Sequence, residues 1–138
     1  MIPRVVIDTN VVVSAAITRR GTPAAALDLV AAHRVTLCVS QPILVEYEGV
    51  LLRPKLRLDP ERVRWLLDLA RLEGVFITPT RTLKESPDEA DNRFLECAAA
   101  AGAGYLVTGN IKDFPQKFET TKILTPRQFV AQMQMEKK

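Results

Sequence analysis

Side chains that bind soft metal ions are scarce in this sequence. Its 138 residues include two cysteines and one histidine. Cys38 and Cys97 each lie within an apolar run, where a free thiol usually packs as a small buried hydrophobe. His33 stands next to Arg34 and is expected at the surface or at a helix end. The sequence therefore offers no histidine and cysteine set of the kind that binds zinc.

Long apolar runs are also missing. The longest falls well short of the roughly 20 residues that a membrane-spanning helix requires, and the first four residues lack the hydrophobic region of a signal peptide. We therefore expect a cytoplasmic protein. The hydrophobic content of 47% can fill one core, so residues 1–138 are expected to form a single domain.

The excess of positive charge is small. A net charge of +3 is too little to indicate nucleic-acid binding by itself. Basic residues gather in one main stretch and one smaller group, which are Arg53, Lys55, Arg57, Arg62 and Arg64, and Arg19 with Arg20. A solvated helix face and a nucleic-acid substrate both explain such clusters, and charge alone does not separate the two.

Short β-branched and aromatic runs alternate with longer helical segments. Five runs are predicted to be strands, at residues 4–8, 35–39, 75–77, 105–107 and 122–124. Strands that alternate with helices of ten or more residues form right-handed crossovers and parallel sheets. The predicted fold is α/β, a three-layer α/β/α arrangement around a mainly parallel five-stranded sheet.

Helix starts are marked by capping side chains that precede a proline. The predicted caps are Thr22, Ser40, Asp59, Ser86 and Thr125. Two of them also have the spacing of a capping box, Ser86 with Glu89 and Thr125 with Gln128. These signals place the acidic residues Glu46, Asp88 and Asp91 on particular helical turns.

Acidic residues occur where strands and helices should meet at one edge of the sheet. Open α/β sheets bind ligands outside the carboxyl ends of their strands. Asp8 ends the first strand, although an aspartate there equally suits the cap of a following helix. Glu46 lies in the first turns of the helix that Ser40 opens. Because apolar residues flank it, Glu46 is predicted to point inward, and Glu48 to another side.

Further polar residues reach the same edge from the second half of the chain. Asp88 and Asp91 lie three apart on one side of a helix. Asp91 is predicted to be the deeper one, because Asp88 in the first turn already gains from the helix dipole. Thr108 and Asn110 follow the fourth strand, with Asp113 a few residues beyond.

Carboxylates that share a partly buried site raise one another's pKa unless a cation compensates their charge. Ligands that are all oxygen atoms favour Mg²⁺ or Mn²⁺. Carboxylate-held Mg²⁺ is widely used to hydrolyse phosphodiesters. The sequence therefore predicts hydrolysis of phosphate esters at this edge.

With these residues placed, the chain resembles the PIN-domain family, specifically the VapC-like ribonuclease toxins of toxin-antitoxin systems. The resemblance covers nearly the whole chain. Four segments carry it: 6–10 (VIDTN), 40–46 (SQPILVE), 88–95 (DEADNRFL) and 106–110 (LVTGN). Each segment is weak alone, but the four occur in order and at the expected structural positions.

The resemblance implies a Mg²⁺- or Mn²⁺-dependent endoribonuclease. It implies Asp8, Glu46 and Asp91 as catalytic acids that bind metal, with Asn110 and Asp113 as further candidate ligands. The residues expected to support these acids are Thr9, Asn10, Ser40, Asp88 and Thr108. The resemblance also implies RNA as substrate, a small antitoxin protein as partner, and a homodimer.

Position 110 departs from the family pattern. Many members carry an aspartate where this chain has Asn110, and an amide supplies no negative charge. Either Asp113 takes over this ligand role, or a second metal ion binds weakly or only with substrate. Asn110 also motivates an alternative, a catalytically degenerate PIN-like domain that binds RNA or protein without cleaving it.

The sequence disfavours one further alternative and leaves one question open. A phosphoryl-transfer domain with Asp8 as a phosphorylated nucleophile would need an aspartate at position 10, where this chain has Asn10, or an acidic pair at the first strand, and neither is present. Trp65, beside the basic stretch, suits either the core or a dimer or antitoxin surface.

Overall fold

The computed structural model describes residues 2–136 and has a six-stranded sheet. The strands are β1 (Arg4–Ile7), β2 (Thr36–Val39), β3 (Val75–Phe76), β4 (Tyr105–Val107), β5 (Lys117–Phe118) and β6 (Thr121–Leu124). Their order is β3-β2-β1-β4-β6-β5, so β3 and β5 form the two edges. Every pairing is parallel except that of β5 with β6.

All five predicted strands are present, and the predicted count is wrong by one. β5 was not predicted because its two residues are too few to show the alternation of a strand. The turn that joins β5 to β6 includes Glu119 in the left-handed region, at φ 54°. This short hairpin adds an antiparallel edge to an otherwise parallel sheet.

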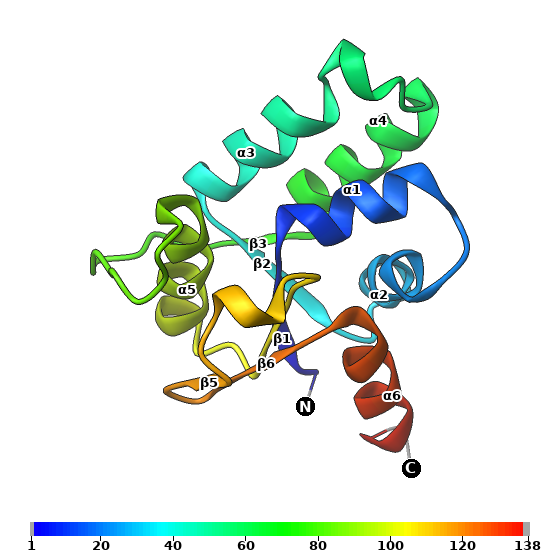
Figure 1. Cartoon of the computed structure of the whole chain (residues 1–138). Helices are drawn as coiled ribbons and strands as arrows, with labels where there is room; N and C mark the ends of the chain where they lie inside the picture. The colour runs from blue at the N-terminus through cyan, green and yellow to red at the C-terminus, as the bar shows by residue number, and fades with distance from the viewer. Residues whose placement is uncertain (1, 137–138) are drawn as a thin grey trace.

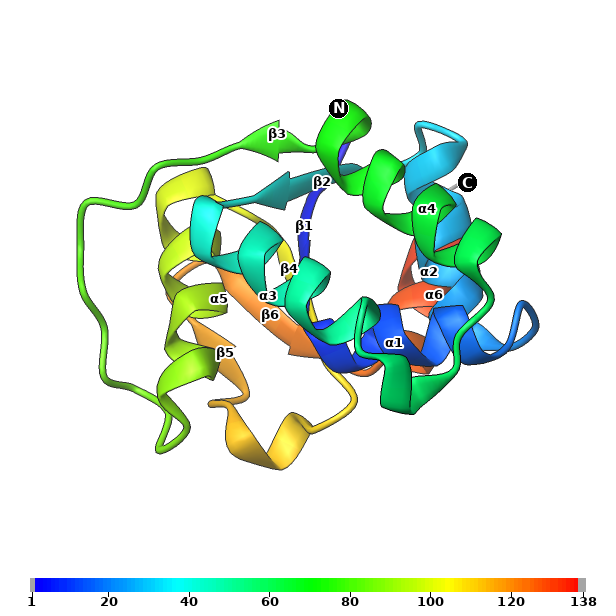
Figure 2. The same cartoon turned by 90° about the horizontal axis from the view of Figure 1, so that it is seen from above.

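Six α-helices surround the sheet. They are α1 (Thr9–Ile17), α2 (Thr22–Ala31), α3 (Gln41–Leu51), α4 (Pro60–Asp68), α5 (Glu89–Ala101) and α6 (Pro126–Glu136). α5 packs on one face, and α2 and α6 lie on the other, while α1, α3 and α4 gather at the carboxyl end of β1 (Figures 1 and 2). This is the expected three-layer α/β/α arrangement.

Most of the predicted helix caps are confirmed. The Ser40 hydroxyl accepts a hydrogen bond from the amide of Ile43 at 3.4 Å, and the Asp59 carboxylate accepts one from Glu61 at 3.1 Å. The capping box of Thr125 and Gln128 is complete, with reciprocal bonds of 3.2 and 3.0 Å. These three helix starts follow from local sequence alone.

Two predicted caps are wrong. Gly21 holds the cap position of α2, and Thr22 is already the first helical residue. Asp88 rather than Ser86 caps α5, accepting from the amide of Ala90 at 3.0 Å. Ser86 does not form the predicted box with Glu89. Its hydroxyl accepts from the amide of Asp88 at 3.4 Å and donates to the carbonyl of Asp113 at 2.9 Å, and its own amide donates to Asn92.

The core lies between the sheet and its covering helices. Val5, Val6 and Ile7 of β1 are fully buried, as expected for a parallel strand covered on both faces. Cys38 and Cys97 are buried free thiols, as predicted. His33 is exposed, as predicted, with its Nδ1 3.6 Å from an oxygen of Glu73. Across residues 2–136, we find no helix with the length and apolar character that a membrane crossing requires.

Trp65 and its basic neighbours are divided between core and surface. Trp65 is 38% exposed, and the guanidinium of Arg62 lies 4.8 Å from the centre of its ring. Arg62 is buried, and its Nε donates to the carbonyl of Ala15 at 3.1 Å. Arg62 is therefore a packing residue rather than part of a solvated basic face, whereas Arg57 and Arg64 are exposed.

Candidate active site

Asp8 lies immediately after β1, in the cap position of α1, but its side chain makes no capping hydrogen bond. One carboxylate oxygen, Oδ2, accepts from the hydroxyl of Thr108 at 2.8 Å and from the side-chain nitrogen Nδ2 of Asn10 at 3.2 Å. The residue is only 5% exposed. The capping explanation for Asp8 is thus wrong, because its side chain turns to the end of β4.

The two glutamates of α3 face different surroundings, as predicted. Glu46 accepts a hydrogen bond from the hydroxyl of Thr9, at the start of α1. Glu48 instead forms a surface ion pair with Arg71. Between them, the buried hydroxyl of Tyr47 donates to the carbonyl of Ile7. This bond fixes α3 to the end of β1 and holds Glu46 beside Asp8.

The first turns of α5 carry Asp91 and a second buried polar residue, Asn92. Asp91 is 9% exposed and Asp88 is exposed, so Asp91 is the deeper acid, as predicted. The Asn92 side chain accepts from the Ser86 amide at 2.8 Å and donates to the Ser86 carbonyl at 3.0 Å. Sequence reasoning missed Asn92, although an amide within the buried face of an amphipathic helix was a usable signal.

The loop after β4 is held close to the end of β1. The amide of Gly109 donates to the Asn10 side-chain oxygen at 3.0 Å, and the amide of Asn110 donates to the Thr108 hydroxyl at 3.0 Å. A Cβ atom at position 109 would lie 3.3 Å from that Asn10 oxygen. Because glycine has no Cβ atom, the backbone at position 109 can lie close to the Asn10 side chain, which bonds both to Asp8 and to this loop.

These residues surround one hollow of about 440 Å³, which we call the acidic hollow. Its lining is Asp8, Thr9, Asn10, Val13, Ser14, Glu46, Val50, Asp88, Ala90, Asp91, Asn110 and Asp113. Of the predicted site residues, only Ser40 and Thr108 are not in the lining. Ser40 caps α3, and Thr108 is buried beneath Asp8. A larger hollow of about 530 Å³ exists between α3 and α4, but no carboxylate lines it.

The environment of the acidic hollow disfavours negative charge. Burial, and to a smaller extent the charge of Glu46, raise the pKa of Asp8 from 3.8 to about 6, although hydrogen bonds such as that of Thr108 act in the opposite direction. Burial raises the pKa of Asp91 to about 7, assisted by Asp8, Asp88, Asp113 and Glu46. Near neutral pH, a proton or a cation therefore relieves this repulsion.

The donor set of the hollow fits a hard cation that keeps part of its own water shell. Among residues 2–136, no three Asp, Glu, His or Cys side chains converge closely enough to enclose an ion by themselves. Mg²⁺ is commonly held by one or two carboxylates, with water and substrate phosphate completing its shell. Carboxylates around an open hollow suit that kind of binding.

Comparisons with known proteins agree with this fold. The family described as PIN domain matches residues 4–112. An uncharacterized protein of Methanocaldococcus jannaschii is 31% identical over 144 residues, covering 95% of this chain and 92% of that protein.

Two solved structures share the fold. A chain of VapBC2 from Rickettsia felis, bound to a DNA fragment from their promoter, aligns with a TM-score of 0.56 at 22% identity, over 79% of this chain and 89% of that chain. The PIN domain of RRP44 from T. brucei aligns with a TM-score of 0.53 at 15% identity, over 99% of this chain and 83% of that chain. The mainly parallel sheet and its helical layers are therefore a known architecture.

Proposed function

The chain belongs to the PIN-domain family, and from that premise we propose that it is a Mg²⁺- or Mn²⁺-dependent endoribonuclease that hydrolyses RNA phosphodiester bonds. The observation that carries the proposal is the acidic hollow, where burial raises the pKa of Asp8 to about 6 and of Asp91 to about 7. Strongly perturbed carboxyl groups in a hollow are typical of catalytic sites.

We assign metal binding to Asp8, Glu46 and Asp91, each of which would hold the ion either directly or through water of the ion's shell. A bound Mg²⁺ or Mn²⁺ would supply stabilisation of charge on the phosphate and activation of the attacking water. The chain's own contribution is orientation. Thr108 and Asn10 fix the Asp8 carboxylate, and Thr9 fixes that of Glu46, so these two carboxylates are held in position before an ion binds.

Asn110 and Asp113 are assigned to the outer rim of the same site. Both line the acidic hollow, and both are exposed, unlike Asp8 and Asp91. We propose that Asp113 provides the carboxylate that Asn110 lacks, either to a second ion or to water bound around the first. The Ser86 hydroxyl bond to the Asp113 carbonyl holds this rim against the start of α5.

We propose a toxin role, with a small antitoxin protein as partner and a homodimer as the assembled form. Two observations support this role. The four sequence segments resemble VapC-like toxins, and the fold is shared with a chain of VapBC2.

The test is cleavage of a mixed pool of single-stranded RNA by the purified full chain. Cleavage should require Mg²⁺ or Mn²⁺, stop in EDTA, and be lost in Asp8→Asn and Asp91→Asn. Asp28→Asn is the matched control, because Asp28 is exposed on α2 outside the acidic hollow. Cleavage that persists in EDTA contradicts the proposal. RNA binding without any cleavage would favour the degenerate binding domain instead.

A further inference from the structure

A further hollow opens beside the acidic hollow, between α1, α2, α6 and the loop after β4. It measures about 390 Å³, within the range of roughly 300–1,000 Å³ that is typical of ligand sites. α2 and α6 lie side by side on one face of the sheet, and α1 packs against α2 (Figures 1 and 2). We call this space the α2–α6 hollow. Its lining therefore comes from elements that are far apart in the sequence.

The two hollows share a border. Asn10, Ser14 and Asn110 line both of them. The Asn10 side chain reaches across this border, because its Nδ2 donates to Asp8 at 3.2 Å while its Oδ1 accepts from the amide of Gly109 at 3.0 Å. Gly109 belongs to the lining of the α2–α6 hollow. A single side chain therefore connects a proposed catalytic acid with the neighbouring hollow.

The two hollows differ in charge. Five carboxyl groups line the acidic hollow, whereas none of the described residues that line the α2–α6 hollow is acidic. The one charged side chain in its lining is the exposed Arg127, in the first turn of α6. None of the ion pairs within residues 2–136 involves Arg127. The border residues Asn10, Ser14 and Asn110 are uncharged, so the border itself carries no negative charge.

The polar groups of the α2–α6 hollow suit a phosphate. Ser14, Thr22 and Thr125 are half-buried and bring hydroxyl groups to its lining beside Arg127. Arg, Ser and Thr side chains are common donors to backbone phosphates, and a guanidinium can bond two phosphate oxygens at once. No described residue of the lining is aromatic, so a base would have no ring to stack on. The hollow therefore suits the backbone of a nucleotide rather than its base.

We propose that the α2–α6 hollow binds the backbone phosphate of a nucleotide that flanks the scissile bond, with Arg127 as its charged contact. The inference rests on the proposed RNA cleavage, and deepens it by stating where the strand leaves the acidic hollow. A bound cation offsets the charge of the scissile phosphate, but a flanking phosphate in the same hollow would face its carboxylates. Crossing the uncharged border brings that phosphate to Arg127 instead.

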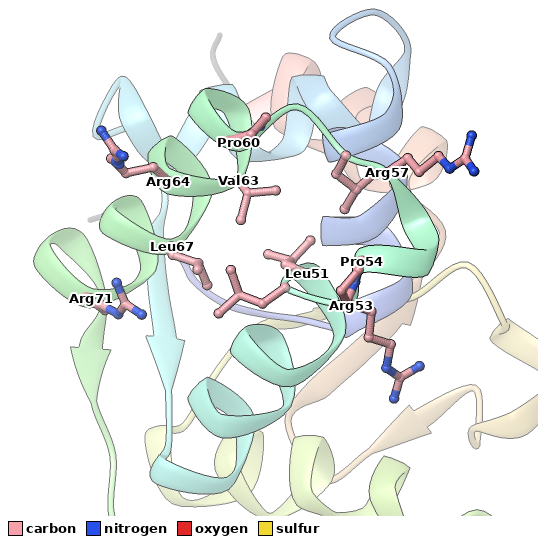
Figure 3. Close-up of a pocket in the computed structure, with 11 residues that line it drawn as sticks. Leu51, Arg53, Pro54, Arg57, Pro60, Val63, Arg64, Leu67 and Arg71 are labelled. Carbon is pink, nitrogen blue, oxygen red and sulfur yellow. The ribbon is translucent and has the colours of Figure 1, made fainter.

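The larger hollow between α3 and α4 does not offer this path. It shares no lining residue with the acidic hollow, so the two have no common border. Leu51, Val63 and Leu67 also point into it and make its floor apolar (Figure 3). Arg64 lies at its side (Figure 3) and therefore serves as a comparison for Arg127 in the test.

The test measures RNA binding separately from RNA cleavage. Binding of a labelled single-stranded RNA of about 12 nucleotides is followed by anisotropy in Mg²⁺ with Asp8→Asn, so that the strand stays intact. Adding Arg127→Gln should weaken binding about tenfold and lower the dependence of log Kd on log salt by about one. Arg127→Lys should lose less affinity, because it keeps the charge without the planar fork. In the chain that retains Asp8, Arg127→Gln should raise KM by a similar factor and leave kcat nearly unchanged.

RNAs that each carry one uncharged methylphosphonate linkage, at a different position in each, identify the phosphate. At one position beside the cleavage site, this linkage should weaken binding to Asp8→Asn. It should not weaken binding further when Arg127→Gln is also present, because both changes remove the same contact. Losses that add at every position would overturn the inference.

The matched controls are Arg64→Gln and Arg34→Gln, which remove the same charge at exposed positions. Arg34 precedes β2, at the end of the sheet opposite Asp8. Both controls should bind RNA as tightly as the chain with Asp8→Asn alone. An equal loss in Arg64→Gln, or unchanged binding in Arg127→Gln, would overturn the inference. If binding depends on Arg127 at one phosphate but the wild type does not cleave RNA, the inference stands and the proposed nuclease activity alone fails.

Discussion

Glu46 and Glu48 stand two positions apart on α3, and their neighbours give them different chemistry. Glu46 lines the acidic hollow and accepts from Thr9, whereas Glu48 is held at the surface by Arg71. A single helix therefore supplies a proposed metal ligand and a structural ion pair. The two residues form a natural pair for mutation because size, charge and helix are the same.

We expect Glu46→Gln to lower the rate of RNA cleavage by roughly a hundredfold or more, because residues of one metal site act as a unit. Glu48→Gln should change the rate little, since exposed ion pairs contribute about 0–1 kcal/mol. Initial rates at saturating Mg²⁺ would measure both. Equal loss in the two variants would show that the effect arises from α3 as a whole.

Asn110 allows a prediction about metal affinity. Asn110→Asp adds a carboxylate at the rim of the acidic hollow, so it should lower the Mg²⁺ concentration that gives half-maximal cleavage. Asp113→Asn should raise that concentration if Asp113 supplies the missing charge. If both variants keep the wild-type Mg²⁺ dependence, neither side chain serves a catalytic ion.

At the scale of elements, α5 is fixed at its start by contacts distant in sequence. Ser86 binds both Asn92 and the carbonyl of Asp113, and so joins the loop before α5 to the rim of the hollow. Asn92 is almost fully buried, and it satisfies both the amide and the carbonyl of Ser86. This clamp sets the position of Asp91.

We expect Asn92→Ala to cost about 2 kcal/mol of unfolding free energy, because it leaves the buried Ser86 amide and carbonyl without partners. It should also weaken Mg²⁺ binding, since Asp91 loses its fixed position. Urea unfolding and calorimetric Mg²⁺ titration would measure the two effects. Normal Mg²⁺ affinity in a destabilised variant would show that Asn92 acts on stability alone.

Three helices, α6, α5 and α1, show where sequence-based prediction of the fold succeeds and fails. The Thr125 box is local, and it was predicted correctly. The Ser86 box is not formed, because the Ser86 amide bonds to Asn92, and the hydroxyl accepts from Asp88 and donates to a carbonyl 27 residues away. The sequence signals do not predict α1. Its run Val11–Val13 is β-branched and disfavours a helix locally, whereas packing against α2 and α3 stabilises one.

At the scale of the whole molecule, burial and mutual repulsion of the carboxylates in the acidic hollow lower the stability of the folded chain. The carboxyls of the hollow came from strand ends and helix starts that topology brings together, so their meeting was predictable from sequence. Their anchors were not, because Tyr47 and Ser86 bind backbone carbonyls that only the tertiary structure places nearby.

The unfavourable ionisation of the buried carboxyls in the acidic hollow predicts that stability depends on pH. The folded pKa values of Asp8 and Asp91, about 6 and 7, exceed the value of 3.8 for an unperturbed aspartate. The folded state then binds more protons than the unfolded state, so these groups make the metal-free protein less stable as pH rises from about 4 through 7. Urea unfolding in EDTA at a series of pH values would measure this loss.

Two comparisons control the pH experiment. Asp8→Asn should be more stable than the wild type near pH 8 in EDTA, and its pH dependence should be shallower. Saturating Mg²⁺ should remove much of the dependence in the wild type if the cation binds these carboxylates. A metal-free wild type that keeps constant stability between pH 5 and pH 8 would rule out the raised pKa values.

The two edges of the sheet determine how copies of this chain can meet. β3 and β5 are each two residues long, and they are the only strands at the edges of the described sheet, which spans residues 4–124. Such short borders offer few backbone groups for pairing with a strand of another molecule. Both the extension of the sheet across a twofold axis and aggregation by repeated edge-to-edge strand pairing are therefore disfavoured. Association between copies is left to side chains on the helices.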